Sequence, residues 1–404
     1  MAFEFSVFDA YFDGENIWFA AIEYNALWRK RLNDDTLEYV GSFPNEKMLQ
    51  WRLYTSVCEH RGKLYFIPGA ACEIGVYDIS EKKFSKINIG IKKEENDTSD
   101  IRYLKKYVSA FVIDDKLVMI PCCYDKIIMY DLNTEIIEMD SSLFELLKEK
   151  YKGSITSSEG KFYLCWNAKI IDKENVVFDL HSNTNTFVKY NMSKNTWVEY
   201  SAGDKGYSYN FIEYQGGNIW LYDDKKMLLI SYSMKDEEYE TFNLPVIGKN
   251  MLFSNMFAYG EYLFFLSASG KSVIRFSLEN RTFDYVEELV SKDLSFSSVA
   301  VKNNDFLCLY APQEQSFVIC QNDKWKFLPC KINRKNMIKL KDQVYLEMRR
   351  DGKVIVVEGA DYDTDDFIRI IQYGNYLTQR DSNRFAALME LSGKKIYKYM
   401  INGE

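Results

Sequence analysis

The sequence has few of the residues on which common metal sites and catalytic triads depend. It contains two histidines, His60 and His181, so a zinc site or a Ser-His-Asp triad would have to use one of them. Neither lies in a ligand-spacing pattern, and no Cys-x-x-Cys pair occurs among the eight cysteines, which argues against a zinc ribbon or a redox dithiol. We therefore predict no metal, no cofactor and no catalytic residue, and we expect the cysteines to be free, core-packed thiols.

The chain also lacks the features of membrane insertion, secretion and nucleic-acid binding. No run of 18 apolar residues occurs, so we expect no transmembrane helix. The start of the chain, Met1–Phe5, has neither the basic residues nor the apolar stretch of a signal peptide, and we expect a cytoplasmic location. Acidic residues outnumber basic ones, 59 to 51, for a net charge of −8, which disfavours a nucleic-acid partner.

Three short motifs are present only in part. Gly270–Ser272 resembles the end of a phosphate-binding loop, but Phe265 stands where that motif needs glycine. The acidic cluster Asp361–Asp366 lacks the glycine and glutamate of an EF-hand, because those positions hold Asp366 and Gln372. Glycoside hydrolysis needs two opposed carboxylates, and a single sequence pairs none. The sequence leaves enzymatic activity undecided and favours a protein that is not an enzyme.

What the sequence does contain is a repeat. An apolar residue followed by an aromatic or apolar pair recurs eight times, at steps of 38 to 57 residues. Repeats of this length indicate one supersecondary unit copied around a ring or along an array. The triplets are Ile17-Trp18-Phe19, Leu64-Tyr65-Phe66, Leu117-Val118-Met119, Phe162-Tyr163-Leu164, Ile219-Trp220-Leu221, Leu263-Phe264-Phe265, Phe306-Leu307-Cys308 and Val344-Tyr345-Leu346.

Each unit is expected to form four short strands. In the second unit these are Tyr54–His60, Lys63–Pro68, Glu73–Ile79 and Phe84–Ile87, separated by polar turns. An aromatic residue with a polar one after it, such as Tyr77-Asp78, precedes the last turn in several units. Four-stranded units of this length are typical of the blades of a β-propeller, so the fold class is all-β.

The order of features within a unit resembles the kelch-like class of propeller repeats. A turn is followed by an aromatic second strand, then by Tyr-Asp, a polar turn and a Trp or Phe. The double glycine of kelch repeats occurs once, at Gly216-Gly217, and the Trp-Asp signature of WD repeats is absent. The resemblance implies a propeller and does not by itself imply a function.

The domain plan is a propeller over residues 1–374 and a helical tail over 375–404 that packs on it. We expect seven or eight four-stranded blades and favour eight, the last built from Lys335–Leu340, Val344–Met348 and Val354–Val357. In the fourth unit, Asn167–Asn185 is expected to be an insertion between the second and third strands, and insertions in repeat proteins often lie on the binding face.

A candidate site follows from the repeat register. Nine positions before the middle of each triplet, seven of eight residues are small and polar, with Phe211 the exception. First strands line the channel of a propeller, so this ring has two interpretations: small residues that fit near the axis, or a ligand site at the channel mouth. The ring comprises Asp9, Ser56, Ser109, Ser154, Asn255, Ser298 and Asn336, and the aromatics proposed for stacking are Trp51, Tyr54, Tyr107 and Tyr209.

Three functions remain open at this stage. The leading hypothesis is a non-enzymatic binding or scaffold module that engages a protein partner of unknown identity through its loops and channel mouth. The alternative is carbohydrate binding or processing, because Tyr and Trp platforms with Asp and Asn suit sugars. A third is self-assembly through the tail, with Phe385 and Tyr397 among its apolar residues.

Overall fold

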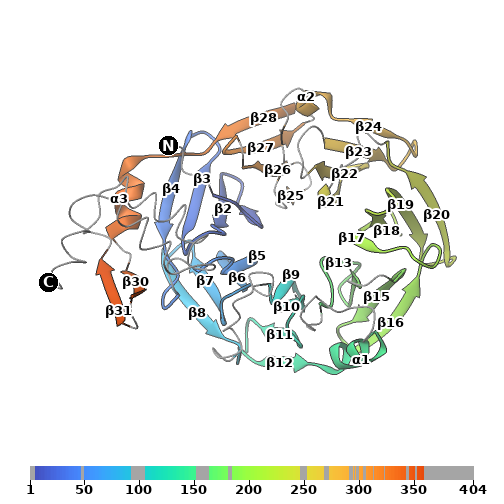
Figure 1. Ribbon diagram of the computed structural model, residues 1–404, viewed down its shortest axis with the longest axis horizontal. Coiled ribbons are helices and arrows are strands. Elements are labelled where there is room, and N and C mark those ends of the chain that lie inside the picture. Colours follow the sequence, from blue (N-terminus) through green and yellow to red (C-terminus); the bar gives the residue numbers. More distant parts are fainter. Residues whose placement is uncertain are drawn as a thin grey trace.

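Seven four-stranded sheets arranged in a ring form the described part of the protein (Figure 1). The computed structural model describes residues 5–358 except 47–49, 92–104, 152–162, 181–183, 246–252, 268–272, 291–293, 295, 297–299, 304–305, 313, 323, 343–344 and 351–352. In each sheet the strands follow one another in sequence order and pair antiparallel, from the axis to the rim. The predicted β-propeller fold is therefore confirmed, with seven blades.

The strands of the first three blades are short, and those of the second blade follow the predicted boundaries closely. They are β1 (Ala10–Phe12), β2 (Asn16–Ala20), β3 (Leu27–Arg31) and β4 (Thr36–Gly41), then β5 (Tyr54–His60), β6 (Lys63–Pro68), β7 (Glu73–Asp78) and β8 (Lys83–Asn88), and then β9 (Tyr107–Ile113), β10 (Lys116–Pro121), β11 (Ile127–Asp131) and β12 (Ile137–Asp140).

The remaining four blades repeat this arrangement. Their strands are β13 (Ala168–Ile170), β14 (Asn175–Asp179), β15 (Thr186–Asn191) and β16 (Thr196–Ser201); β17 (Tyr209–Gln215), β18 (Asn218–Asp223), β19 (Leu228–Ser233) and β20 (Glu238–Asn243); β21 (Phe253–Tyr259), β22 (Tyr262–Ser267), β23 (Val273–Ser277) and β24 (Phe283–Tyr285); and β25 (Ala300–Asn303), β26 (Phe306–Ala311), β27 (Ser316–Gln321) and β28 (Lys324–Pro329).

Among the described residues, three helices accompany the blades: α1 (Ser142–Lys150), α2 (Glu287–Val290) and α3 (Arg334–Asp342). The longest of them has nine residues. Over the described ranges, no helix is both long and apolar enough to cross a membrane.

The recurring Tyr-Asp pattern has a physical cause in the turn between the third and fourth strands. The Asp78 carboxylate accepts the backbone N–H groups of Ser80 and Glu81, and the turn ends at Lys82, whose φ is 54°. Asp, Asn and Ser side chains close such turns because they hydrogen-bond their own backbone two or three residues on. The same closure recurs at Asp131, Asn191, Ser233 and Ser277.

The core consists of the interfaces between neighbouring sheets. The second strands supply two of its largest residues, Trp18 and Trp220, each 2% exposed. The third strands add aromatics such as Tyr190 and Phe276, both 0% exposed. A full apolar side chain buried in this way contributes roughly 1.5–3 kcal/mol, so the repeated aromatic positions hold each blade against the next.

The eighth blade predicted from the sequence is wrong. The expected strand Lys335–Leu340 is part of helix α3, and β30 (Tyr345–Arg350) pairs only with β31 (Lys353–Glu358) among the described strands. Met337 and Leu340 are buried, and this three-residue spacing is helical, not β. The expected tail, residues 375–404, lies outside the described residues.

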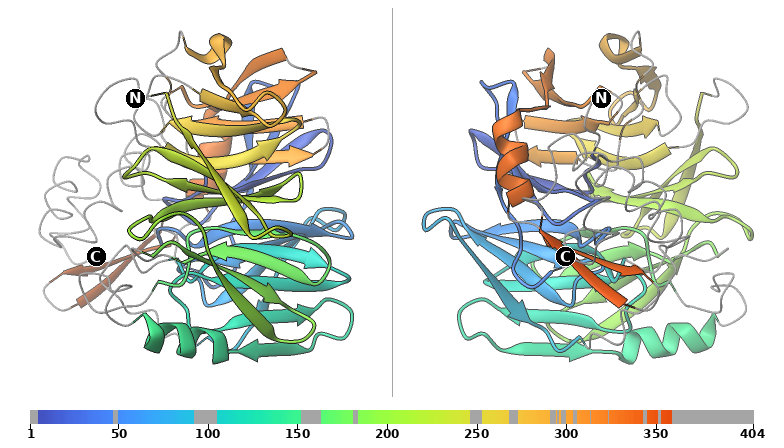
Figure 2. Two further views of the ribbon diagram at one scale, coloured as in Figure 1. Left: turned by 90° about the vertical axis from the view of Figure 1, so that its right-hand side faces the viewer. Right: turned by 60° about the vertical axis from the view of Figure 1, so that its left-hand side comes forward.

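The ring closes by a fifth strand on the first blade. β29 (Lys331–Ile332) leaves the seventh blade and pairs parallel with β4, after which α3 packs against β4. Figure 2 shows α3 beside the first blade and the β30–β31 hairpin beyond it. A shared apolar cluster that includes Phe5, Tyr310 and Leu340 fills the space between the first and seventh blades.

The fourth blade corrects a second expectation. Asn167–Asn185 is not an insertion, because it contains both inner strands of the blade, β13 and β14. The triplet Phe162-Tyr163-Leu164 is not the second strand, and the part of it that is described is irregular chain leading into β13. Buried apolar triplets thus occur in lead-in segments as well as in strands, and the triplet alone does not distinguish them.

Candidate functional site

Three residues of the predicted ring, and the exception Phe211, lie at one equivalent position of the first strands. Ser56, Ser109, Phe211 and Asn255 each pair with the residue one before the end of the second strand. In all four blades the ladder register shifts just before this residue, which marks a β-bulge. The bulge is a shared structural feature of the first strands, and the small polar residues follow it.

Asp9 is a ring member that accepts three hydrogen bonds. Its carboxylate accepts hydrogen bonds from Ser56 Oγ at 2.8 Å, from the backbone N–H of Val57 at 3.0 Å and from that of Ala10 at 2.9 Å. Burial raises the pKa of Asp9 to about 6, against the effect of these hydrogen bonds and of Lys169, which lower it. Asp9 therefore joins the first blade to the second.

Other polar groups of the inner strands also connect neighbouring blades. Thr55 Oγ1 donates to the carbonyl of Tyr107 at 2.7 Å, and Asn167 Nδ2 donates to that of Asn210 at 3.0 Å. Glu213, 3% exposed, accepts Lys169 Nζ at 2.9 Å and the N–H of Ala258 at 3.1 Å. These bonds satisfy buried polar groups and favour the structural interpretation of the ring over a ligand site within the channel.

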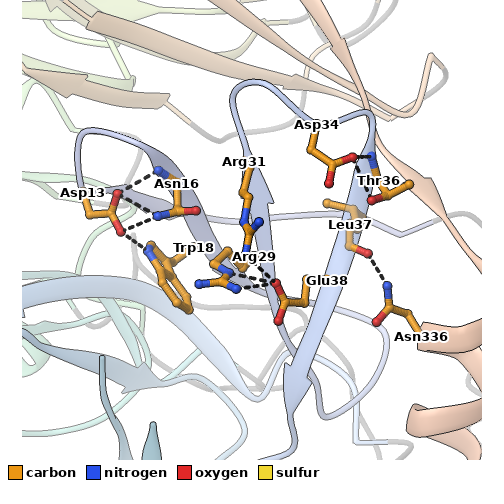
Figure 3. A network of polar contacts seen from close by, with 10 residues as sticks. All are labelled: Asp13, Asn16, Trp18, Arg29, Arg31, Asp34, Thr36, Leu37, Glu38 and Asn336. Atoms are coloured by element: carbon orange, nitrogen blue, oxygen red, sulfur yellow. Dashed lines mark hydrogen bonds and ion pairs between the residues drawn. The ribbon is translucent and has the colours of Figure 1, made fainter. Parts of the chain in front are cut away.

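The remaining three members of the predicted ring do not lie on described inner strands. Ser154 and Ser298 lie outside the described residues. Asn336 is not on an inner strand: it lies on α3, 8% exposed, and its side chain donates to the carbonyl of Leu37 in β4 at the outer edge of the first blade (Figure 3). Asn336 thus helps to close the ring and is remote from the axis.

Three of the four predicted stacking aromatics belong to the core. Tyr54, Tyr107 and Tyr209 are 5%, 0% and 1% exposed. The Tyr209 hydroxyl donates to the carbonyl of Ala202, and Gly75 leaves room for Tyr54, because a Cβ at Gly75 would lie 2.7 Å from the Tyr54 hydroxyl. These residues begin the first strands, where aromatic rings fill the gap between blades, and they offer no surface to a ligand.

The fourth aromatic, Trp51, belongs to a group of residues that the sequence did not reveal. Arg52 lies over the rings of Trp51 and Phe8, with its guanidinium carbon 4.0 Å and 5.4 Å from their centroids. Lys105 Nζ lies 5.9 Å from the Phe8 centroid and 5.0 Å from that of Trp166. We call these five partly exposed residues the mouth cluster.

The position of the cluster follows from the topology. Phe8, Arg52, Lys105 and Trp166 each lie two residues before the first strand of blades one to four. In antiparallel blades, first strands begin at the same end of the ring at which the second-to-third connections lie. The cluster therefore forms at one end of the axis, where the chain enters four consecutive blades.

Backbone hydrogen bonds hold the lead-in segments in place. The Arg52 N–H donates to the carbonyl of Ile22 at 2.6 Å, and the Arg52 carbonyl accepts the N–H of Ala70 at 2.7 Å. The N–H of Trp166 donates to Asp179 at 3.3 Å. Each segment is thus tied to a second-to-third connection, which gives the cluster a rigid support.

Electrostatically, the mouth cluster has two cations without a carboxylate partner among the described residues. Burial lowers the pKa of Lys105, and Arg52 lowers it further. Burial likewise lowers the pKa of Arg52, whose Nε is buried without a hydrogen-bond partner in the described structure. The nearby carboxyl groups have raised pKa values for the same reason: about 7 for Asp179 and about 6 for Glu23.

One more cation–aromatic pair lies at the equivalent place in the fifth blade. Tyr207 is two residues before β17, and Lys226 Nζ lies 3.7 Å from its ring centroid. The signal that sequence reasoning missed is therefore a register position, two residues before each first strand, which carries a cation or an aromatic in the first five blades.

Comparison with known proteins identifies the fold. No known family profile and no curated protein match the chain. YCF48 from Cyanidioschyzon merolae is similar in structure, with a TM-score of 0.56 and 10% identity over 76% of this chain and 93% of that chain. A structure of YCF48 bound to D1 peptide gives 0.55 and 10% over 76% and 89%. KlHsv2 with loop 6CD replaced by a Gly-Ser linker gives 0.50 and 10% over 80% and 96%.

These similar structures are β-propellers, which agrees with the seven-bladed ring described above. At 10% identity they show the fold alone. The narrower kelch-like resemblance stays a prediction.

Proposed function

We propose that this propeller is a non-enzymatic binding module that holds a protein partner at the mouth cluster. The observation that carries the proposal is the convergence of Trp51, Arg52, Lys105, Phe8 and Trp166 from four blades at one end of the axis. Trp and Arg are among the residue types enriched at the energetic centres of protein interfaces, and here they are partly exposed on a rigid support.

The structure of YCF48 bound to D1 peptide supports the proposal as a precedent, since that propeller is similar in shape and holds a peptide. The structural alternative is that the mouth cluster has no partner and only fills one end of the central channel. Two cations without carboxylate partners in the described structure argue against it, because an apolar plug would be less costly to bury.

Site-specific photocrosslinking in the native host tests the proposal. A photoreactive phenylalanine analogue is placed at Gln50, beside Trp51, and in a second protein at Ile136, which is 58% exposed in the turn between β11 and β12 at the opposite end of the ring. We expect a crosslinked partner from position 50 that disappears when Trp166→Ala is added, and none from position 136.

Each contrary result has a definite meaning, provided that the variants keep the wild-type melting temperature. Crosslinks from position 136 alone would move the interface to the other end of the ring. No crosslink from either position would reject protein binding at the mouth cluster and make carbohydrate, the alternative from the sequence, the next class to screen.

A further inference from the structure

The two cations of the mouth cluster are its least expected feature. In a chain with a net charge of −8, basic side chains have many carboxylates with which to pair. Two basic side chains that do so are Lys169, which pairs with Glu213 at 2.9 Å, and Arg275, which pairs with Asp284 at 2.8 Å. Within the described ranges, Arg52 and Lys105 form no such pair.

The carboxyl groups that lie near these cations bind backbone N–H groups. Asp179 is fully buried; its Oδ1 accepts the backbone N–H groups of Trp166 and Asn167, and its Oδ2 has no hydrogen-bond partner in the described structure. Glu23 accepts the N–H of Ser6 at 3.0 Å. Glu23 raises the pKa of Arg52 and Asp179 raises that of Lys105 through space, but neither carboxyl group makes an ion pair with these cations. Their own raised pKa values mean that they compensate positive charge weakly.

Arginine cannot relieve this situation by losing its proton, because the guanidinium remains charged in proteins. Aromatic faces offer it partial compensation, worth about 0.5–2 kcal/mol for each contact. The buried Nε of Arg52 still has no acceptor in the described structure. A cation that is partly buried and lacks an anion is costly to the free protein, and that cost is removed when a carboxylate binds.

From this arrangement we infer that the mouth cluster recognises an acidic peptide segment, with a carboxylate held by Arg52 and Lys105 and a neighbouring apolar side chain packed on Trp51 and Trp166. The inference rests on the proposed function and specifies the partner chemistry. Arginine binds a carboxylate with two parallel hydrogen bonds, and lysine adds a point charge. Both cations contact the ring of Phe8, and Arg52 acts on the pKa of Lys105 through space, so we place the carboxylate of the peptide between them.

Fluorescence anisotropy with two defined peptides tests the inference on the full-length protein. The probes are rhodamine-labelled, amidated Ala-Leu-Asp-Asp-Leu-Ala and the same peptide with both aspartates replaced by asparagine. We expect the acidic peptide to bind about tenfold tighter or more. Arg52→Gln and Lys105→Gln should each weaken its binding about tenfold and leave the asparagine peptide unaffected.

Lys226→Gln is the matched control. Lys226 also lies over an aromatic side chain at the same end of the propeller, but in the fifth blade. The variant should bind the acidic peptide as the wild type does. Added salt should weaken acidic-peptide binding to the wild type and have less effect on the Arg52→Gln protein, because one charge contact is gone.

The outcomes separate this inference from the proposed function. Equal binding of the two peptides, both lost in Trp166→Ala, would overturn the acidic preference and leave the binding module in place. Failure of both peptides to bind would also overturn it, and the crosslink from position 50 would then decide the proposed function. Displacement by inorganic phosphate at matched ionic strength would make the cluster a general anion site and overturn the peptide specificity.

Discussion

Ser56 donates a hydrogen bond of 2.8 Å to Asp9 across the boundary between the first and second blades. The two residues were predicted to be equivalent members of a polar ring, and instead one is the partner of the other. Asp9 also accepts the Val57 N–H from the second blade. A charge-assisted contact of this kind stabilises the assembled ring.

Ser56→Ala should therefore destabilise the fold by about 1–2 kcal/mol, because it removes one hydrogen bond to a buried carboxylate. Ser109→Ala is the control: Ser109 has the same ladder position in the third blade, and no hydrogen bond of its side chain to a described residue is present. Urea unfolding measures both. Equal losses in the two variants would show that the contact with Asp9 adds nothing.

Asp179 predicts a pH dependence of stability. Burial raises its pKa to about 7 from an ordinary value of 3.8, so the folded protein keeps a proton that the unfolded chain has lost. This contribution to stability is full below about pH 4 and is lost as the pH rises through about 7. Between about pH 5 and about pH 8 the wild type should lose on the order of 2 kcal/mol through this group.

Asp179→Asn removes that titration and keeps an oxygen that can accept the N–H groups of Trp166 and Asn167. The difference in unfolding free energy between the wild type and the variant should therefore shift in favour of the variant as the pH rises. Thermal or urea unfolding over this pH range measures it, and parallel curves for the two proteins would contradict the assignment.

The closing helix gives a prediction about the stability of the whole ring. Leu340 is fully buried between α3 and the first blade, whereas Ile338 on the same helix is 39% exposed. Leu340→Ala should cost about 2–4 kcal/mol, and Ile338→Ala about 0.5 kcal/mol or less. If the two substitutions cost the same in urea, α3 would not be part of the packed ring.

Gly75 predicts how tightly Tyr54 is packed. A Cβ at this position would lie 2.7 Å from both the Phe43 ring and the Tyr54 hydroxyl. Gly75→Ala should destabilise the protein by about 1–3 kcal/mol through overpacking, and Phe43→Leu in the same protein should recover part of that loss. Unchanged stability in Gly75→Ala would mean that Tyr54 is free to move and would restore it as a ligand-binding candidate.

The sequence predicted the blades because their determinants are local. The buried residues at Trp18, Tyr65 and Trp220 recur with the strands, and the Asp78 type of turn closes by contacts within four residues. The same local reasoning failed after residue 330. There, Val344-Tyr345-Leu346 repeats the triplet, but the preceding segment packs on the first blade, which lies about 300 residues earlier in the chain.

The site was harder to predict than the fold because its members contact one another only in the assembled ring. Lys105 and Trp166 are separated by an entire blade in sequence. Small polar residues such as Ser56 attracted the prediction, yet the Ser56 hydroxyl bonds Asp9 across a blade boundary. The mouth cluster depends instead on long side chains at a register position outside the strands, where strand periodicity carries no information.

The fifth strand of the first blade has a consequence for the order of events during synthesis. The four antiparallel strands of every blade come from one continuous stretch of chain, so these strands can pair soon after the last of them leaves the ribosome. The rim strand of the first blade, β4, acquires its partner β29 only after the seventh blade has been made. Until then the nascent protein is an open arc of blades, and the outer faces of its first and last blades are uncovered. The final folding step is therefore the docking of the seventh blade on the first, after which the seven sheets can unfold as one cooperative unit.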